Sequence, residues 1–355
     1  MTQVTSPAVD AGVPLLQVTD LRTYFYSDDG VAKAVDGVSF DVRKSETVGI
    51  VGESGSGKSV TALSILRLVS QTARIEPGSR VVFEGRNLAT LDDETMRSIR
   101  GQRIGMIFQE PMSALNPVLT VGEQIAEVVR VHTSASKAEA WQQAVDMLAL
   151  TGIPAAAERA SQYPHQLSGG MRQRVMIAMA LVMHPSLVIA DEPTTALDVT
   201  IQAQILELLR DLRERFAMAM LLITHDLGVV AESCDRVLVM YGGEIVEAAD
   251  VVTLFRTPHH PYTQGLLRAI PRLGMRHERL LTIPGVVPPS TAWPTGCRFR
   301  DRCEYAWDRC EREHPPLYQI GPAHTSRCHL AVEPERARRT HTPDASHAPA
   351  VTGAA

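Results

Sequence analysis

The chain contains the stretch Gly52-Glu53-Ser54-Gly55-Ser56-Gly57-Lys58-Ser59, which follows an apolar run at 47–51 and precedes a helical pattern at 60–69. This is the G-x-x-x-x-G-K-[ST] pattern of a phosphate-binding loop, in the strand-to-helix position that the motif requires. Glycines let backbone N–H groups turn toward phosphate oxygens at the positive end of a helix. We expect Lys58 to reach the β- and γ-phosphates of a nucleotide and Ser59 to bind Mg²⁺.

Two carboxylates, Asp191 and Glu192, end a second apolar strand predicted at 187–190. In this position the first acid is typical of an Mg²⁺ ligand, and the second can polarise an attacking water. A third apolar run, at 220–224, precedes His225. Such continuous apolar runs, separated by helical segments, predict a buried parallel sheet and an α/β fold.

Another glycine-rich stretch, Leu167-Ser168-Gly169-Gly170-Met171, opens a further helical segment. Small residues at a helix start form an anion site. A second anion site is redundant if one chain binds its nucleotide alone. The stretch therefore indicates a site that serves a second chain.

In this order the three motifs resemble those of ATP-binding cassette (ABC) proteins, over about residues 15–257, although Met171 stands where the usual signature has Gln. The resemblance implies a RecA-like P-loop NTPase core with an antiparallel β subdomain and a helical subdomain inserted at about 110–183. It also implies that two cassettes pack head to tail. Ser168 and Gly170, with Gly169 between them, would then contact the γ-phosphate of the ATP bound by the partner.

The same resemblance assigns roles to four further residues. Gln109 would join the metal site to membrane subunits, and His225 would sense the γ-phosphate. Asp198 belongs to Ala196-Leu197-Asp198, which is similar to the loop that communicates across the dimer. Phe25 is similar to the aromatic residue that stacks on adenine, with a tyrosine on either side of it.

The segments 109–117, 191–200 and 260–263 resemble the ATPases of bacterial oligopeptide and dipeptide importers. This resemblance implies ATP-driven peptide import through two membrane subunits fed by an extracytoplasmic binding protein. The partner cassette is expected to be a similar but distinct chain. Nickel or another small solute is the alternative cargo.

Four of the five cysteines, Cys297, Cys303, Cys310 and Cys328, fall within 32 residues. Their spacings exceed the C-x₂₋₄-C pairs typical of structural zinc, whereas iron–sulfur clusters also take four cysteines. Some peptide-importer ATPases carry a [4Fe–4S] cluster in a similar region, so the resemblance predicts such a cluster, with zinc or unligated cysteines as alternatives. We expect it to hold together a small Cys-rich domain at 258–332.

Composition narrows the class of protein further. No apolar run reaches the roughly 20 residues needed to span a bilayer, and the N-terminus lacks a signal-peptide pattern, which predicts a protein at the cytoplasmic face of the membrane. Residues 1–14 and 333–355 are expected to be disordered ends. A net charge of −5 gives no reason to expect binding to nucleic acid, so an ABC ATPase that acts on nucleic acid is the weaker alternative.

Overall fold

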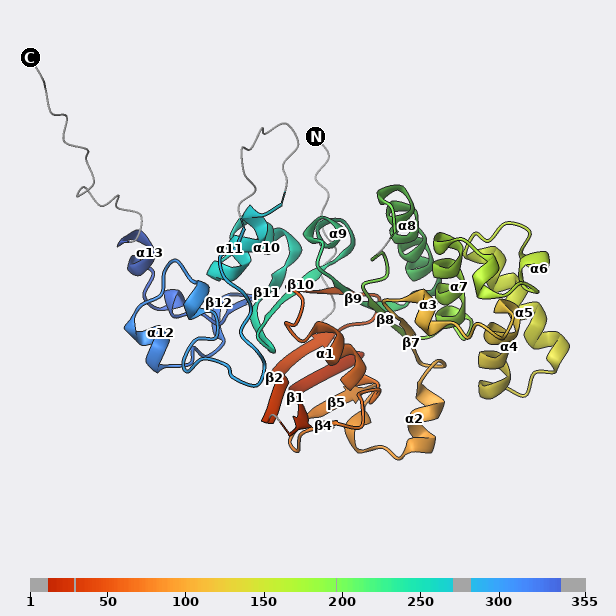
Figure 1. Cartoon of the computed structure of the whole chain (residues 1–355), viewed down its shortest axis with the longest axis horizontal. Helices are drawn as coiled ribbons and strands as arrows, with labels where there is room; N and C mark the ends of the chain where they lie inside the picture. The colour runs from red at the N-terminus through yellow and green to blue at the C-terminus, as the bar shows by residue number, and fades with distance from the viewer. Residues whose placement is uncertain (1–11, 29, 196, 271–281, 340–355) are drawn as a thin grey trace, which may run out of the picture.

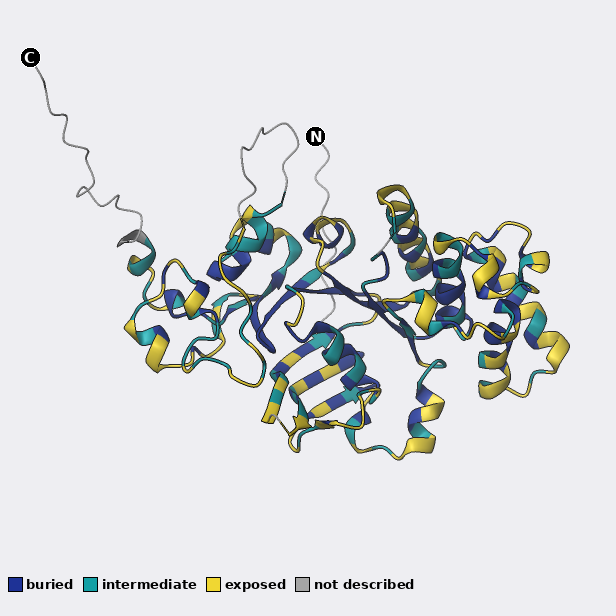
Figure 2. Cartoon of the chain, viewed as in Figure 1, coloured by how far each residue is buried: buried dark blue, intermediate teal, exposed yellow. Residues whose placement is uncertain are grey.

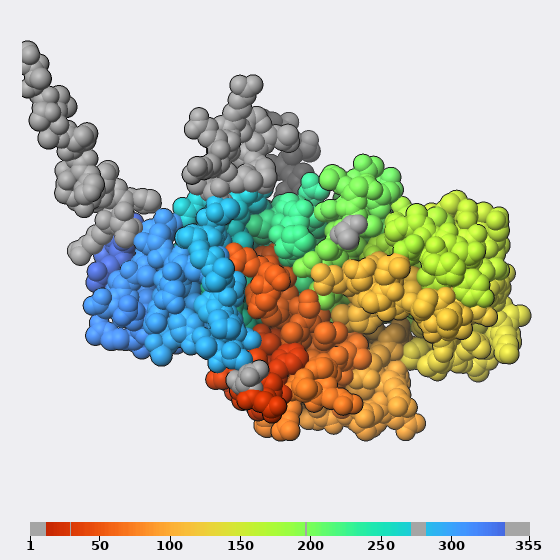
Figure 3. Space-filling view, in the orientation of Figure 1, coloured from red at the N-terminus to blue at the C-terminus, as the bar shows by residue number. Residues whose placement is uncertain are grey.

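The computed structural model describes residues 12–28, 30–195, 197–270 and 282–339. These residues form an eight-stranded sheet, a five-stranded sheet and a group of helices inserted between strands β7 and β8 (Figure 1). The helical group lies at one end of an elongated molecule and the C-terminal region at the other. The five-stranded sheet lies between these two ends (Figure 3).

The eight-stranded sheet has the order β12-β13-β11-β10-β3-β9-β8-β7. Strands β10, β3, β9, β8 and β7 pair in parallel, which confirms the predicted parallel sheet. Strands β11, β13 and β12 extend it by antiparallel pairing. The strand bounds are β3 Thr47–Val51, β7 Ile104–Ile107, β8 Leu187–Asp191, β9 Ala219–Thr224, β10 Arg236–Tyr241, β11 Glu244–Asp250, β12 Tyr318–Gly321 and β13 His324–Ser326.

Both faces of the parallel strands are buried, each in a different core. On β8, Leu187 and Ile189 join the core shared with helix α1 (Lys58–Ile65) and the smaller sheet, whereas Val188 and Ala190 join the core shared with the other helices. Successive side chains of a strand point to opposite faces. A strand covered on both faces is therefore apolar throughout, which is why the sequence shows continuous apolar runs.

The smaller sheet is antiparallel, with the order β2-β1-β5-β6 and β4 paired to β1. Its long strands alternate buried and exposed residues, because one face packs on the core and the other faces solvent (Figure 2). Asp29, between β1 and β2, lies outside the described residues. The bounds are β1 Leu16–Ser27, β2 Gly30–Val42, β4 Ala73–Ile75, β5 Arg80–Phe83 and β6 Arg86–Asn87.

Helices α3 to α7 form the inserted group. Capping boxes fix the starts of α4 and α5, where Thr120 pairs with Glu123 and Ser136 with Glu139. The helix bounds are α2 Asp93–Ile99, α3 Pro111–Ala114, α4 Val121–His132, α5 Lys137–Leu150, α6 Ala156–Arg159, α7 Gly169–Leu181, α8 Val199–Phe216, α9 Leu227–Ser233, α10 Val251–Arg256, α11 Pro261–Arg268, α12 Asp308–Arg312 and α13 Glu335–Arg339.

The structure does not support a separate small Cys-rich domain. Strand β13 pairs with β11, so β12 and β13 continue the cassette's own sheet. Phe299 is buried in the main core, and Cys297 and Cys303 pack against that core. No local pattern in the sequence could reveal that β12 and β13 return to the same sheet.

The ends of the chain are described only in part. Residues 1–11 and 340–355, most of the two segments predicted to be disordered, lie outside the described residues. Helix α13 occupies the start of the predicted tail. In the described part of the chain, no helix has the length and apolar character needed to cross a bilayer.

His260, at the start of α11, makes the stability of this fold depend on pH. Its Nδ1 accepts a hydrogen bond from the backbone N–H of Tyr262, 3.1 Å away. Burial lowers the pKa of His260 to about 4, although the Glu247 carboxylate opposes the shift. Because the unfolded chain takes up this proton near pH 6.5, the contribution of neutral His260 is complete above pH 6.5 and is lost as the pH falls toward 4.

The variant His260→Asn should remove this pH dependence, because Asn keeps a side-chain acceptor at the helix start but does not titrate. Between pH 6.5 and 4, the free energy of unfolding of the wild type should fall more steeply than that of the variant, by up to about 1.4 kcal/mol per pH unit. Urea unfolding at several pH values measures both slopes. Equal slopes in the two proteins would show that His260 is not the group responsible.

Candidate nucleotide site

The loop between β3 and α1 has the conformation that its glycines permit. Gly57 has a φ of 102°, and a Cβ at this position would lie 2.4 Å from the carbonyl oxygen of Ala34. At Gly52 a Cβ would lie 2.2 Å from the carbonyl oxygen of Met240. Neither position can hold a side chain without moving backbone. The predicted loop is confirmed in its place between this strand and this helix.

Lys58, the first residue of α1, is buried and folds back over the loop. Its Nζ donates hydrogen bonds to the carbonyl oxygens of Gly52, at 2.7 Å, and Glu53, at 3.0 Å. Burial lowers the pKa of Lys58, while nearby carboxylates, Glu192 foremost, act in the opposite direction. A cation held by loop carbonyls can exchange these partners for phosphate oxygens.

Ser59 and Asp191 face each other across the start of α1 and the end of β8. The Ser59 hydroxyl donates to Oδ1 of Asp191, at a distance of 3.0 Å. Burial raises the pKa of Asp191, although the hydrogen bond from Ser59 and the charge of Lys58 favour the ionised form. Mg²⁺ in proteins is bound by oxygen ligands such as hydroxyls and carboxylates. Ser59 and Asp191 place one of each side by side, so this pair fits the predicted Mg²⁺.

Glu192 follows β8 in a left-handed conformation, with a φ of 46°. Three side chains converge on its Oε2: Thr195 donates at 2.8 Å, Gln109 Nε2 donates at 3.3 Å, and His225 Nδ1 lies 3.3 Å away. Strained backbone in a non-glycine residue is common at active sites. The structure thus brings together three residues predicted from the sequence and adds Thr195, which was quoted within a motif but given no role.

Parallel pairing explains this convergence. Gln109, Glu192 and His225 each follow the carboxyl end of one of the neighbouring strands β7, β8 and β9. The phosphate-binding loop follows β3, which is the next strand along. The carboxyl ends of parallel strands lie at one edge of a sheet, where ligands of α/β proteins bind.

The signature segment lies elsewhere. Ser168 begins α7, and its Oγ accepts a hydrogen bond from the backbone N–H of Met171 at 3.4 Å. Gly169 and Gly170 form the first turn of the helix. Figure 1 shows α7 in the helical group, well separated from α1. One chain therefore does not bring the signature to its own phosphate-binding loop.

Asp198 and Phe25 lie on two further elements around the site. Asp198 caps α8 by accepting a hydrogen bond from the N–H of Ile201 at 3.0 Å, while Ala196 lies outside the described residues. Phe25 is half-buried on β1. The tyrosines on either side of Phe25 donate their hydroxyl hydrogens to Asp36 and Glu76, at 2.6 and 2.8 Å. The role of Phe25 as the aromatic residue that stacks on adenine stays a prediction.

The four clustered cysteines line one small cavity in the C-terminal region; they are Cys297, Cys303, Cys310 and Cys328. Burial raises the pKa of all four thiols, that of Cys297 to about 11 and that of Cys303 to about 12. Within the described residues, however, no three His, Cys, Asp or Glu side chains are arranged to hold a metal ion. The described residues thus show no metal centre at these cysteines, and the [4Fe–4S] cluster and its zinc alternative stay predictions.

This arrangement of loop, acidic pair, glutamine and histidine on a parallel sheet, with a helical insertion that carries a signature, defines an ATP-binding cassette. The sequence profile of the ABC transporter family matches residues 35–195. The profile described as "Oligopeptide/dipeptide transporter, C-terminal region" matches residues 246–310. The chain belongs to the ABC transporter family of ATP-binding proteins, which hydrolyse ATP to power transport.

Curated relatives cover nearly the whole length of the chain. It is 54% identical to the probable peptide ABC transporter ATP-binding protein y4tR of Sinorhizobium fredii, over 88% of this chain and 94% of that protein. It is 48% identical to the dipeptide transport ATP-binding protein DppD of Escherichia coli and 52% identical to the oligopeptide transport ATP-binding protein AppD of Bacillus subtilis. In each of these two comparisons, the match covers 90% of this chain and 97% of the relative.

Solved cassettes share the fold. The dimeric, post-hydrolysis structure of the ATP-binding cassette MJ0796 bound to ADP and Pi aligns with a TM-score of 0.60 and 28% identity, over 66% of this chain and 98% of that chain. CbiO1 of Clostridium perfringens, part of the ABC transporter complex CbiONQ, aligns with a TM-score of 0.58 and 26% identity, over 69% and 91%. The fold shared with solved cassettes is therefore the one expected for the ABC transporter family.

Proposed function

We propose that this chain is the ATP-hydrolysing subunit of a peptide importer, acting at the cytoplasmic face of the membrane. The observation that carries the proposal is the set of side chains gathered on Glu192, in a chain whose relatives are named as peptide, dipeptide and oligopeptide transport proteins. Nickel or another small solute is the alternative cargo. An ABC ATPase that acts on nucleic acid is the alternative of another class.

Some residues at the edge of the sheet bind MgATP, and others catalyse its hydrolysis. The residues that hold MgATP are the loop from Gly52 to Ser59, together with Asp191. Ser59, Asp191 and Gln109 would hold Mg²⁺, which neutralises charge on the transferred phosphoryl group. Lys58 exchanges its loop carbonyls for phosphate oxygens when ATP enters.

Glu192 is the general base in this proposal. Gln109, Thr195 and His225 all contact its Oε2, so its other oxygen can face an attacking water. His225 is largely exposed, with 62% of its side chain accessible, as a residue that meets a γ-phosphate or a second cassette has to be. Glu192 aligns and deprotonates the water for in-line attack.

The second cassette supplies what this chain lacks. Ser168, Gly169 and Gly170 begin a helix of 13 residues, whose N-terminus favours an anion. Since they lie far from this chain's own loop, they would contact the γ-phosphate bound by a similar but distinct partner. Asp198, at the start of α8, would lie at the interface between the two cassettes and communicate across it. The dimeric MJ0796 structure supports this arrangement as an analogy.

One of the two membrane subunits would dock on a groove between the core and the helical insertion. The groove has a volume of 430 Å³, and its walls come from β7 on one side and α4 on the other. Its lining includes Phe108, next to Gln109, and the exposed side chains of Leu68 and Val131. We propose that a helix of the membrane subunit occupies it, so that docking is felt at Gln109. An extracytoplasmic peptide-binding protein would supply the cargo.

The variant Glu192→Gln tests the catalytic assignment. In vesicles that contain the assembled transporter, the binding protein loaded with peptide should stimulate ATP hydrolysis by the wild type. Glu192→Gln should lower kcat by about 10²- to 10⁴-fold, because the amide cannot accept the proton of water. ATP binding should remain, since Gln can still accept the contacts that converge on Oε2. Phosphate release and nucleotide binding measure the two steps.

The exposed variant Glu207→Gln, on α8, is the matched control and should turn over normally. Near-normal hydrolysis by Glu192→Gln would remove this residue from the role of base. Stimulation by nickel with its binding protein, or by nucleic acid, in place of peptide would establish one of the alternative functions.

We also propose that the four clustered cysteines hold a [4Fe–4S] cluster. The support is that all four thiols line one cavity, and that four cysteine thiolates are the usual ligands of such clusters. Burial raises the pKa of these thiols and so disfavours their ionised form. The positive charge of a bound cluster would offset this cost by stabilising the thiolates. Its role here would be structural.

Protein purified without oxygen should be brown and contain iron. Cys303→Ser should lose the colour and the iron, because it removes one of the four proposed ligands. Cys234→Ser is the control, since Cys234 is buried in the main core. Elemental analysis and the visible spectrum measure both properties. A colourless wild type with stoichiometric zinc would replace the proposal by the zinc alternative, and one without metal would leave the cysteines unligated.

A further inference from the structure

Glu53, the second residue of the phosphate-binding loop, turns its side chain away from the nucleotide space toward the C-terminal region. Arg302 holds it with two parallel hydrogen bonds, Nη1 to Oε2 at 2.7 Å and Nη2 to Oε1 at 3.1 Å. The Arg302 side chain is 5% exposed and that of Glu53 is 29% exposed. A bidentate pair of this kind fixes geometry as well as charge. It joins residues that are 249 positions apart in the sequence.

The same loop residue is also held through its backbone. The N–H of Glu53 donates to the hydroxyl oxygen of Tyr262 at 2.8 Å. Tyr262 is fully buried, and its ring packs on Tyr241 and Phe299, with centroids 4.7 and 5.4 Å away. In the sequence, the segment 260–263 carried only a resemblance to peptide-importer ATPases. In the structure, its Tyr262 holds the backbone of the phosphate-binding loop.

Arg302 is itself rigidly placed. Its guanidinium lies over the rings of Tyr241 and Phe299, 5.7 and 6.0 Å from their centroids. Its Nε donates to the carbonyl oxygen of Pro284 at 2.8 Å. A planar guanidinium that is stacked and fully hydrogen-bonded loses little further freedom when it holds a carboxylate. The anchor is thus preorganised before ATP binds.

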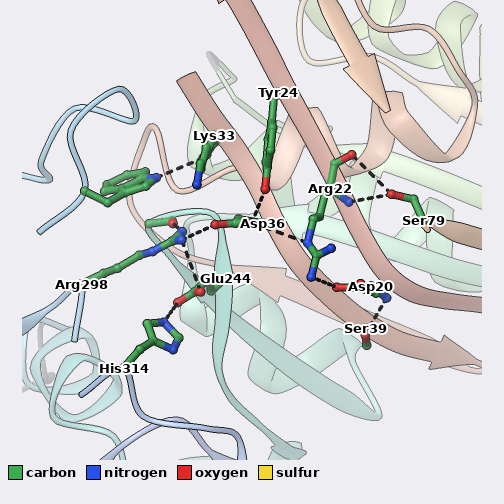
Figure 4. Close-up of polar contacts among 12 residues, drawn as sticks. Asp20, Arg22, Tyr24, Lys33, Asp36, Ser39, Ser79, Glu244, Arg298 and His314 are labelled. Carbon is green, nitrogen blue, oxygen red and sulfur yellow. Dashed lines mark hydrogen bonds and ion pairs between the residues drawn. The ribbon is translucent and has the colours of Figure 1, made fainter. Parts of the chain in front are cut away.

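A second arginine of the same segment contacts two strands, β2 and β11. Figure 4 shows Arg298 directed at Asp36 on β2 and at Glu244 on β11. Asp36 also accepts a hydrogen bond from Tyr24, which neighbours the predicted adenine-stacking residue. Burial opposes the charge of Asp36, but the hydrogen bonds from Tyr24 and Arg298 outweigh it and lower its pKa. The C-terminal region therefore contacts both the phosphate-binding loop, through Arg302, and strand β2, through Arg298.

These contacts matter because of the charge on ATP. A carboxylate in the phosphate-binding loop repels the polyphosphate unless a cation neutralises it. Arg302 supplies that cation and at the same time keeps the carboxylate turned away. We propose that Arg302 is a positioning residue for ATP binding, acting through Glu53 with Tyr262 as its backbone counterpart. This inference rests on the proposed function only in that ATP binds at this loop.

The test compares Arg302→Met, Glu53→Gln and the double variant in the assembled transporter. Arg302→Met leaves an unpaired carboxylate beside the phosphates, so the KM for MgATP should rise about tenfold, with kcat changed less than about twofold. Adding Glu53→Gln removes that carboxylate and should recover most of the affinity. A role of Arg302 in packing alone would not be rescued in this way. Steady-state hydrolysis and direct ATP binding measure the effect.

Arg309→Met is the matched control, because Arg309 pairs with Glu313 and Glu333 in the same region at 2.9 and 2.7 Å. Its KM should equal that of the wild type. An unchanged KM in Arg302→Met, or a double variant as weak as Arg302→Met, would overturn the inference. Peptide stimulation of the wild type reports separately on the proposed function, since its loss with ATP binding intact would change the cargo and leave the role of Arg302 standing.

Discussion

The carboxyl ends of four neighbouring parallel strands open at one edge of the larger sheet, and the nucleotide chemistry depends on that constraint. Strand β3 leads into the phosphate-binding loop, and β8 ends at the acidic pair. The flanking strands β7 and β9 deliver Gln109 and His225 to the same carboxylate oxygen of Glu192. Strands buried on both faces can move little, so side chains that are far apart in sequence are held within hydrogen-bond distance before any ligand arrives.

The C-terminal region extends the larger sheet and does not form a separate domain. Strand β13 adds to the sheet through β11, and the buried carboxylate of Glu247 on β11 accepts hydrogen bonds from His259, His260 and His324. These contacts place α11 and the segment around Phe299 against the loop. A region that resembled a separate module in the sequence packs against the phosphate-binding loop through Arg302 and Tyr262.

The sequence predicted the parts of the site that local patterns encode. Apolar runs predicted β3, β8 and β9 to within a residue, because strands buried on both faces admit few polar residues. The glycines between Gly52 and Gly57 predicted the phosphate-binding loop, because the close approach of other backbone at these two positions leaves no room for a side chain. The Arg302–Glu53 pair was not predictable, since no local pattern links residues 249 positions apart. Thr195 was missed because its task depends on the turn that follows Glu192.

We infer that one chain holds its ATP with its own loop but needs a second chain's signature to complete the site. The most direct measurement is ATP turnover per cassette, first for the isolated chain as a monomer and then for the chain assembled with its partner cassette and membrane subunits. We expect the isolated chain to bind MgATP but to hydrolyse it slowly, and we expect assembly to raise turnover strongly. An isolated monomer that hydrolyses ATP at the assembled rate would contradict it.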